Sequence, residues 1–257
     1  MAPLTTAPTA DWRLAVVLAV LTATAVLVSA AARLGVAREQ LTAAVRATVQ
    51  LAVVSAVIAV VLASARWSLA FVLMMFLVAT ATSARRLGVP VGQAPLVGLA
   101  IIAGAGPVVT LCLGSGVVPF NGPGIIPVAG IVIGGAMTAA TLTGRRAFQE
   151  LAAQTGTYEA GLALGLSATE ATELVVLPTA GEALTPGIDQ TRTVGLVTLP
   201  GAFVGVLLGG GSAVEAGAAQ VLVLVGLLAA QAITTAALLG MVARGRVTRT
   251  DLTSLPR

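Results

Sequence analysis

The sequence contains no histidine and no lysine, and it has a single cysteine, Cys112. Without histidine it cannot build a Ser-His-Asp triad or an HExxH zinc site. Without lysine it cannot form the GxxxxGKS/T phosphate loop, whose lysine reaches the β- and γ-phosphates. One cysteine provides neither a disulfide framework nor a thiolate metal cluster. We therefore expect a chain that is not an enzyme and carries no cofactor. Any ATP that drives it, with its Mg²⁺, must be bound by another chain.

Charged residues are scarce as well. Only 9% of the residues are charged and 57% are hydrophobic, whereas an ordinary soluble domain is about 25% charged. Such a chain needs the lipid bilayer as part of its solvent. Its net charge of +4 comes from arginines at the ends of apolar runs, which indicates membrane topology and not nucleic-acid binding. The composition predicts an all-α, multi-pass protein of the inner (plasma) membrane.

Apolar runs long enough to cross a bilayer recur along the chain, since a spanning helix needs about 20 mostly apolar residues. None of the 14 arginines and ten acidic residues falls inside them, as the cost of burying charge in lipid requires. We predict one transmembrane domain over residues 1–257 with about seven spans. These lie near 14–32, 47–65, 67–84, 94–113, 124–143, 194–211 and 218–242.

The arginines also predict the orientation, because cytoplasmic loops are enriched in basic residues. With the N-terminus outside, only Arg13 and Arg66 lie on the outer side, and the other 12 arginines lie on the inner side. The C-terminus is then cytoplasmic. The first run, 14–32, lacks a basic segment before it and is longer than the core of a secretion signal. We interpret it as an uncleaved anchor and not as a cleaved signal peptide.

The long segment between the fifth and sixth apolar runs, 144–193, is predicted to lie in the cytoplasm. Within it, 159–178 reads EAGLALGLSATEATELVVLP. Gly165 is suited to end one helix in the left-handed conformation, and the sequence Ser167 to Glu170 is a capping box that starts the next helix. Pro178 interrupts the backbone hydrogen bonds and would end or kink that second helix. The residues predict a helix–turn–helix hairpin, which by itself is also compatible with an ordinary polar connection.

This hairpin resembles the EAA loop of ABC-importer permeases, with Gly161 in place of the second alanine and Val175 in place of isoleucine. The resemblance implies that the segment docks into a separate ATP-binding subunit and transmits its movement. The expected coupling residues are Glu159, Ala160, Gly161, Gly165, Ser167, Glu170, Leu177 and Pro178.

A second resemblance covers nearly the whole chain. The strings TVGLVTLPGAFVGVLLGG (193–210), VRATVQL (45–51) and IIPVAGIVIGGAM (125–137), with Pro186 and Asp189, are similar to the bacterial FetB-type iron-export permeases. Plant relatives of that family are linked to aluminium tolerance. The resemblance implies a permease homodimer with separate ATPase subunits, which exports a metal ion or metal complex.

The residues themselves give little support for a metal. The predicted spans hold no histidine and no acidic residue, so we assign no metal ligands. We interpret Cys112 as a small buried residue of the packed core and not as a ligand. The candidates for a translocation path are Arg46, Gln50, Met137, Pro200, Gly201 and Gln220. The alternative function is a secondary transporter or channel without ATP coupling. Coupled carriers usually keep ionisable groups inside the membrane, and the expected spans have none.

Overall fold

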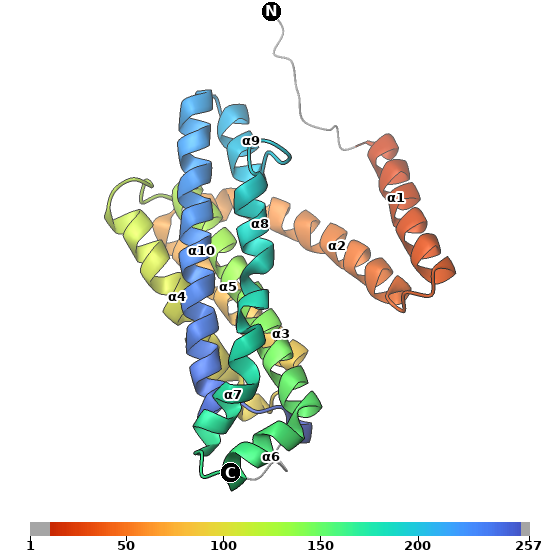
Figure 1. Ribbon diagram of the computed structural model, residues 1–257. Coiled ribbons are helices and arrows are strands. Elements are labelled where there is room, and N and C mark those ends of the chain that lie inside the picture. The colour runs from red at the N-terminus through yellow and green to blue at the C-terminus, as the bar shows by residue number, and fades with distance from the viewer. Residues whose placement is uncertain (1–10, 253–257) are drawn as a thin grey trace, which may run out of the picture. The chain divides into compact units, whose positions relative to one another are not determined.

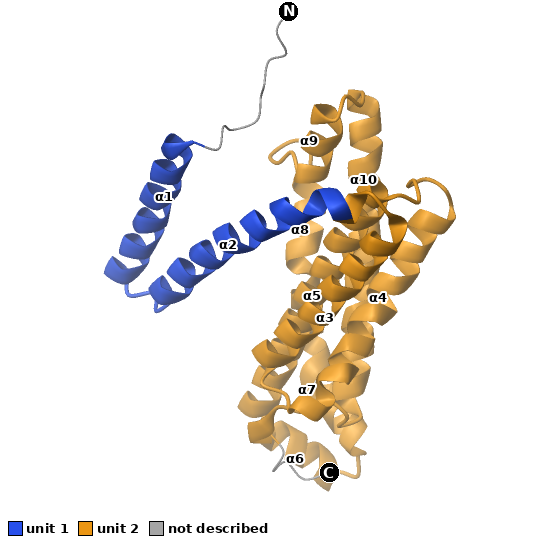
Figure 2. Cartoon of the chain, turned by 180° about the vertical axis from the view of Figure 1, so that it is seen from behind, with its two compact units in different colours: residues 1–60 blue, residues 61–257 orange. Residues whose placement is uncertain are grey.

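The computed structural model describes residues 11–252, which belong to two units, residues 1–60 and 61–257 (Figure 2). The first unit contains α1 (Trp12–Ala31) and most of α2 (Ala37–Leu62). The carboxylate of Asp11 starts α1 by accepting the N–H groups of Arg13 (3.0 Å) and Leu14 (3.1 Å), which would otherwise have no partner. Both helices expose apolar side chains along nearly their whole length, as lipid-facing helices do.

The second unit holds the remaining helices. Four are long: α3 (Ala65–Leu87), α4 (Ala94–Gly114), α5 (Gly122–Ala153) and α10 (Ala213–Ala243). The shorter helices are α6 (Thr155–Ala163), α7 (Ala168–Ala180), α8 (Thr185–Thr193) and α9 (Gly201–Leu208), and the 3₁₀ turns are η1 (Val91–Gln93), η2 (Gly181–Leu184) and η3 (Thr250–Leu252). Within residues 11–252 there is no strand, only one isolated β-bridge between Val194 and Thr198. The chain is thus an all-α, multi-pass membrane protein.

Among residues 11–252, six helices, α1 to α5 and α10, are long and apolar enough to cross a membrane. The span predicted near 194–211, the sixth of about seven, is not a continuous helix in the structure. Residues 194–200 are irregular, with Gly195 at φ +80°, and only the eight residues of α9 are helical after them. Pro200 has no N–H to continue a helix across this break, and Gly210 has φ +90° just after α9.

The core lies between α3, α4, α5 and α10, and small residues let these helices approach closely. Between α4 and α10, Gly104 faces the backbone of Ala230. Hydroxyl pairs also join helices, as between Thr143 of α5 and Thr235 of α10 (3.0 Å). Close packing and interhelical hydrogen bonds of this kind hold helices together in lipid.

The helices α5 and α10 run in the same direction. The pairs Gly135–Leu227 and Thr143–Thr235 are in contact, so the two sequences advance together. The chain must therefore return between them. It does so in pieces, since α7, η2 and α8 follow one another along α10, and α9 continues beside it (Figure 1).

Candidate functional site

The hairpin of α6 and α7 lies at the end of the second unit where α5 finishes. Its turn is built on Gly165, which has φ +91°. The N–H of Gly165 donates to the carbonyl of Leu162 (3.0 Å), and the N–H of Leu166 donates to the carbonyl of Gly161 (3.1 Å). This pair of bonds is the Schellman motif, which satisfies the last carbonyls of a helix. The predicted left-handed end of the first helix is confirmed.

The second helix of the hairpin begins with the predicted capping box. The hydroxyl of Ser167 accepts the N–H of Glu170 (3.3 Å), while the carboxylate of Glu170 accepts the N–H of Ser167 (2.8 Å). These bonds favour the ionised carboxylate, so the side-chain and backbone hydrogen bonds of Ser167 lower the pKa of Glu170. Both helix ends at the turn are thus fixed by local hydrogen bonds.

The inner face of the hairpin is packed. Tyr158 and Gly161 of α6 are buried, and a side chain at Gly161 would meet Leu166 and Ala171. Pro178 lies inside α7, which continues two residues further and then tightens into η2. The hairpin is therefore a small helical body of its own and not a loose loop.

Its outer face exposes leucines, of which Leu164 lies at the tip. Leu164 is 86% exposed, and Leu174 and Leu177 of α7 are about half exposed. The side chains of Glu159 and Ala160 are also exposed. Leu164 and Leu174 were not among the expected coupling residues. Which side chains of the hairpin are exposed depends on where α6 ends and α7 begins, and this is known only from the structure.

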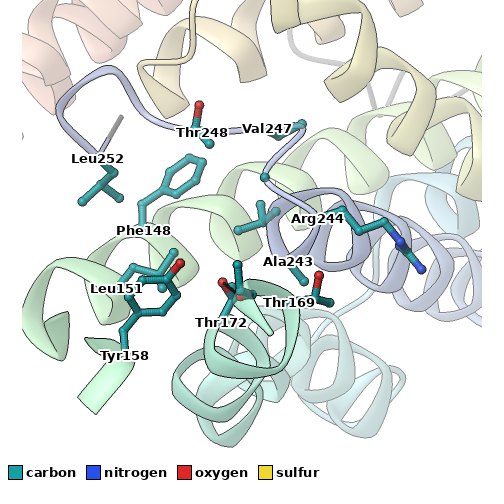
Figure 3. Close-up of a pocket in the computed structure, with 13 residues that line it drawn as sticks. Phe148, Leu151, Tyr158, Thr169, Thr172, Ala243, Arg244, Val247, Thr248 and Leu252 are labelled. Carbon is teal, nitrogen blue, oxygen red and sulfur yellow. Dashed lines mark hydrogen bonds between the residues drawn. The ribbon is translucent and has the colours of Figure 1, made fainter. Parts of the chain in front are cut away.

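Behind the hairpin lies a cavity of about 190 Å³ (Figure 3). Its walls come from Phe148 and Leu151 of α5, Tyr158 of α6, Thr172 of α7 and the residues that follow α10. The side chain of Arg244 points away from it and donates to the carbonyl of Gly240 (2.9 Å). The walls are mostly apolar side chains, with Thr169 and Thr172 of α7 and Thr248 among them.

Residues 244–252, which we call the C-terminal strap, cross this end of the helices. The side-chain carbonyl of Gln93 accepts the N–H of Thr248 (2.9 Å), and Arg249 lies over the ring of Phe148 at 6.0 Å. Val247 is fully buried. The strap thereby ties the start of α4 to α5 next to the hairpin.

An ion-pair network joins α5 to the segment that follows the hairpin. The guanidinium of Arg146 bonds to the carboxylate of Glu182 in η2 (3.3 Å) and pairs with Glu150 one turn along α5 (3.3 Å). The hairpin is therefore held to α5 on both sides, directly through α6 and through Arg146 beyond α7.

The candidate path residues belong to both units, two to the first and four to the second. Arg46 and Gln50 lie one turn apart on α2 in the first unit. In the second unit, the N–H of Phe203 donates to the side-chain carbonyl of the buried Gln220 (3.2 Å), which holds the start of α9 against α10 just after Pro200 and Gly201. Met137, half-buried on α5, packs against the core.

No group of three or more histidine, cysteine, aspartate or glutamate side chains within residues 11–252 could hold a metal ion. Cys112 is buried among apolar residues of the core. At the hairpin end, Arg146 is paired with Glu150 and Glu182.

Three comparisons place the chain among known proteins. The model of an uncharacterised protein family, UPF0014, matches residues 12–246. UPF0014 membrane protein STAR2 of Oryza sativa subsp. japonica is 37% identical over 216 residues, which are 83% of this chain and 75% of the rice protein. The probable iron export permease protein FetB of Escherichia coli strain K12 is 29% identical over 213 residues, 82% of each chain. Protein ALUMINUM SENSITIVE 3 of Arabidopsis thaliana is 35% identical over 159 residues, 62% of this chain and 58% of the plant protein. No solved structure matches the chain significantly.

Proposed function

Because this chain belongs to the UPF0014 family, we propose that it is the membrane-spanning permease subunit of an ATP-driven ABC transporter. The hairpin of α6 and α7 docks on a separate ATP-binding subunit, which hydrolyses ATP with Mg²⁺. The observation that carries this proposal is an ordered hairpin with exposed leucines, above all Leu164 at its tip. Exposed apolar side chains of this kind are more stable when they are buried in a partner's apolar cleft than when they remain in water.

Three features favour the hairpin as the coupling element. It matches the spacing of an EAA loop from Glu159 to Pro178. Its turn is fixed by a Schellman motif and a capping box, so little conformational entropy is lost when a partner binds it. The cavity behind it leaves room for a small shift against α5 and α10, which a close-packed contact would resist.

The arginine distribution supports a cytoplasmic hairpin, with the N-terminus outside. We assign the chain to the inner (plasma) membrane, as a homodimer in which each copy carries one ATPase subunit. Each permease presents one hairpin, so two copies supply the two docking points that a pair of ATPase subunits requires.

For the cargo we propose a metal ion, iron-like, or a metal complex, moved out of the cytoplasm. This follows the printed name of the Escherichia coli relative, a probable iron export permease. Since the described residues contain no His, Cys, Asp and Glu cluster that could hold a metal, the cargo would cross without a fixed set of such ligands.

The test is co-purification of the permease with a candidate ATPase, followed by metal-stimulated ATP hydrolysis in liposomes. The variant Leu164→Glu places a charge at the tip of the hairpin and should abolish co-purification. Val91→Glu is the matched control, because Val91 is another apolar side chain, 91% exposed, beside the strap. If both variants bind the ATPase as the wild type does, the hairpin is not the docking element.

A further inference from the structure

The helix α8 packs along the middle of α10. Gly187 is buried there, and a side chain on it would collide with the amide of Gln231. At about 1.5 Å per residue, Gln231 lies about 24 Å from Glu215 near the start of α10 and about 20 Å from Arg244 just past its end. If α10 crosses a hydrocarbon core of about 30 Å, Gly187 lies close to the centre of the bilayer.

The residues after α8 stay beside the apolar stretch of α10. The next contact with α10 is the hydrogen bond from Phe203 to Gln220, which lies about 16 Å along α10 from Gln231. Residues 188–202 therefore lie between two levels of α10 that are both inside its apolar stretch. They include the irregular backbone of 194–200.

The two faces of α8 differ in character. Gly187 is buried and Ile188 and Thr191 are half-buried, whereas Asp189, Gln190 and Arg192 are exposed. The carboxylate of Asp189 and the guanidinium of Arg192 form an ion pair at 3.8 Å, with side chains that are 60% and 74% exposed. One side of α8 thus fits the helix bundle, and the other carries charge.

Lipid cannot be the environment of that charged side. Ionised groups and non-helical backbone are tolerated at membrane depth only against protein or in a water-filled cavity. Next to α8, the Gln231 side-chain oxygen is buried and has no hydrogen-bond partner within residues 11–252. Such buried unpaired groups are rare and point to a ligand or water.

We propose that residues 185–208 form a seventh, broken membrane crossing and that its Asp189–Arg192 face lines a water-filled path for a charged solute. The inference rests on the proposed permease function and deepens it. It revises two expectations from the sequence. The cytoplasmic segment ends near Glu182 and not at 193, and the seventh crossing begins at α8 and not at 194.

Thiol accessibility tests the environment of this face, in a Cys112→Ala background and with the transporter assembled in membranes. Gln190→Cys should react with a charged, membrane-impermeant thiol reagent at least ten-fold faster than Val225→Cys. Val225 is a matched site on α10 at similar depth, and it is 57% exposed on an apolar surface. Equal, slow reaction at both sites would mean that the α8 face is covered by protein or lipid, which overturns the path.

The depth of α8 is tested separately through Gly187. Gly187→Leu places its side chain on Gln231 and should lose most of its folded protein in detergent, whereas Gly181→Leu, with open space around it, should keep wild-type levels. If Gly187→Leu is as stable as Gly181→Leu, α8 does not lie on α10, and a reactive Gln190→Cys is then merely cytoplasmic.

Transport separates this inference from the proposed function. Asp189→Asn and Arg192→Gln should each reduce transport at least ten-fold while ATPase co-purification stays unchanged, and Glu39→Gln, an exposed carboxylate on α2, should transport normally. Normal transport by both α8 variants would overturn the path even if the ATPase binds. If no ATPase binds but Gln190→Cys is reactive and Gly187→Leu unstable, the crossing stands and ATP coupling fails.

Discussion

The turn of the hairpin provides the sharpest test of how the permease meets its ATPase. Gly165 has φ +91°, and no other residue would meet a side chain added there. Gly165→Ala and Gly165→Val therefore change the backbone preference without creating a clash inside the protein. Gly156, in the first turn of α6, also has open space around it but an ordinary helical backbone. Gly156→Ala adds the same methyl group without the conformational strain.

The expected size of the effect follows from the backbone. A residue with a Cβ costs roughly 1–2 kcal/mol in the left-handed conformation, and a β-branched one is a stronger outlier. If the ATPase binds only the formed hairpin, Gly165→Ala should weaken its affinity by up to roughly five- to thirty-fold. Gly165→Val should weaken it further. Asparagine tolerates this conformation, so Gly165→Asn should retain most of the affinity.

The assay is ATPase affinity measured on permease in lipid nanodiscs, with membrane expression as the check on folding. Gly156→Ala should bind like the wild type, because alanine is favoured over glycine within a helix. Wild-type affinity for Gly165→Val would show that the hairpin is not the docking element. If Gly165→Asn were as weak as Gly165→Val, direct contact with the side chain and not the backbone conformation would be responsible.

Three further predictions concern topology, packing and pH. In a Cys112→Ala background, Phe120→Cys should label from outside intact cells and Thr157→Cys only from inside; labelling of both from outside would reverse the orientation. Cys112→Ala should lower the free energy of unfolding by about 1–2 kcal/mol, and Met137→Leu should lower it by less than about 1.5 kcal/mol. Both variants should keep most of the transport activity, and loss of transport in a folded variant would identify a ligand. Because the pKa of Glu170 is lowered in the folded state, its stabilisation of the hairpin is present above the ordinary glutamate range and is lost as the pH falls through the lowered value. Hydrogen exchange of the hairpin amides should therefore rise in acid beyond the intrinsic rates, and Ser167→Ala should remove this dependence.

The sequence was informative where a short motif determines its own geometry. Gly165, Ser167 and Glu170 act on backbone groups no more than a few residues away, so their positions alone predicted the turn and the cap that the structure contains. The six long helices were also predictable, because each contains an apolar stretch long enough to cross a membrane. Hydropathy predicts the apolar span and not the whole helix, and α2 (Ala37–Leu62) extends beyond its predicted span toward the N-terminus.

The broken segment could not be predicted because its environment is made by other parts of the chain. Hydropathy treats Asp189 and Arg192 as residues of a loop, since in lipid they would be too costly, and it treats the apolar run after them as a helix. Only the contact of Gly187 with Gln231 reveals that the polar part lies beside α10. The exposed tip at Leu164 was missed for a similar reason, because exposure depends on how α6 and α7 pack.

The way in which the hairpin is joined to the helices bears on how movement would pass through the permease. Gln154 both ends α5 and begins α6, so no flexible linker separates them. On the other side α7, η2 and α8 follow without a gap, and Arg146 ties η2 to α5. Movement of the hairpin must therefore move the start of α8 as well, because a helix resists bending more than an irregular segment does. The first irregular stretch along this route is 194–200, directly after Asp189 and Arg192. We infer that ATPase-driven displacement is absorbed at this break, where it would change the shape of the proposed path and leave the packed core of α3, α4, α5 and α10 intact.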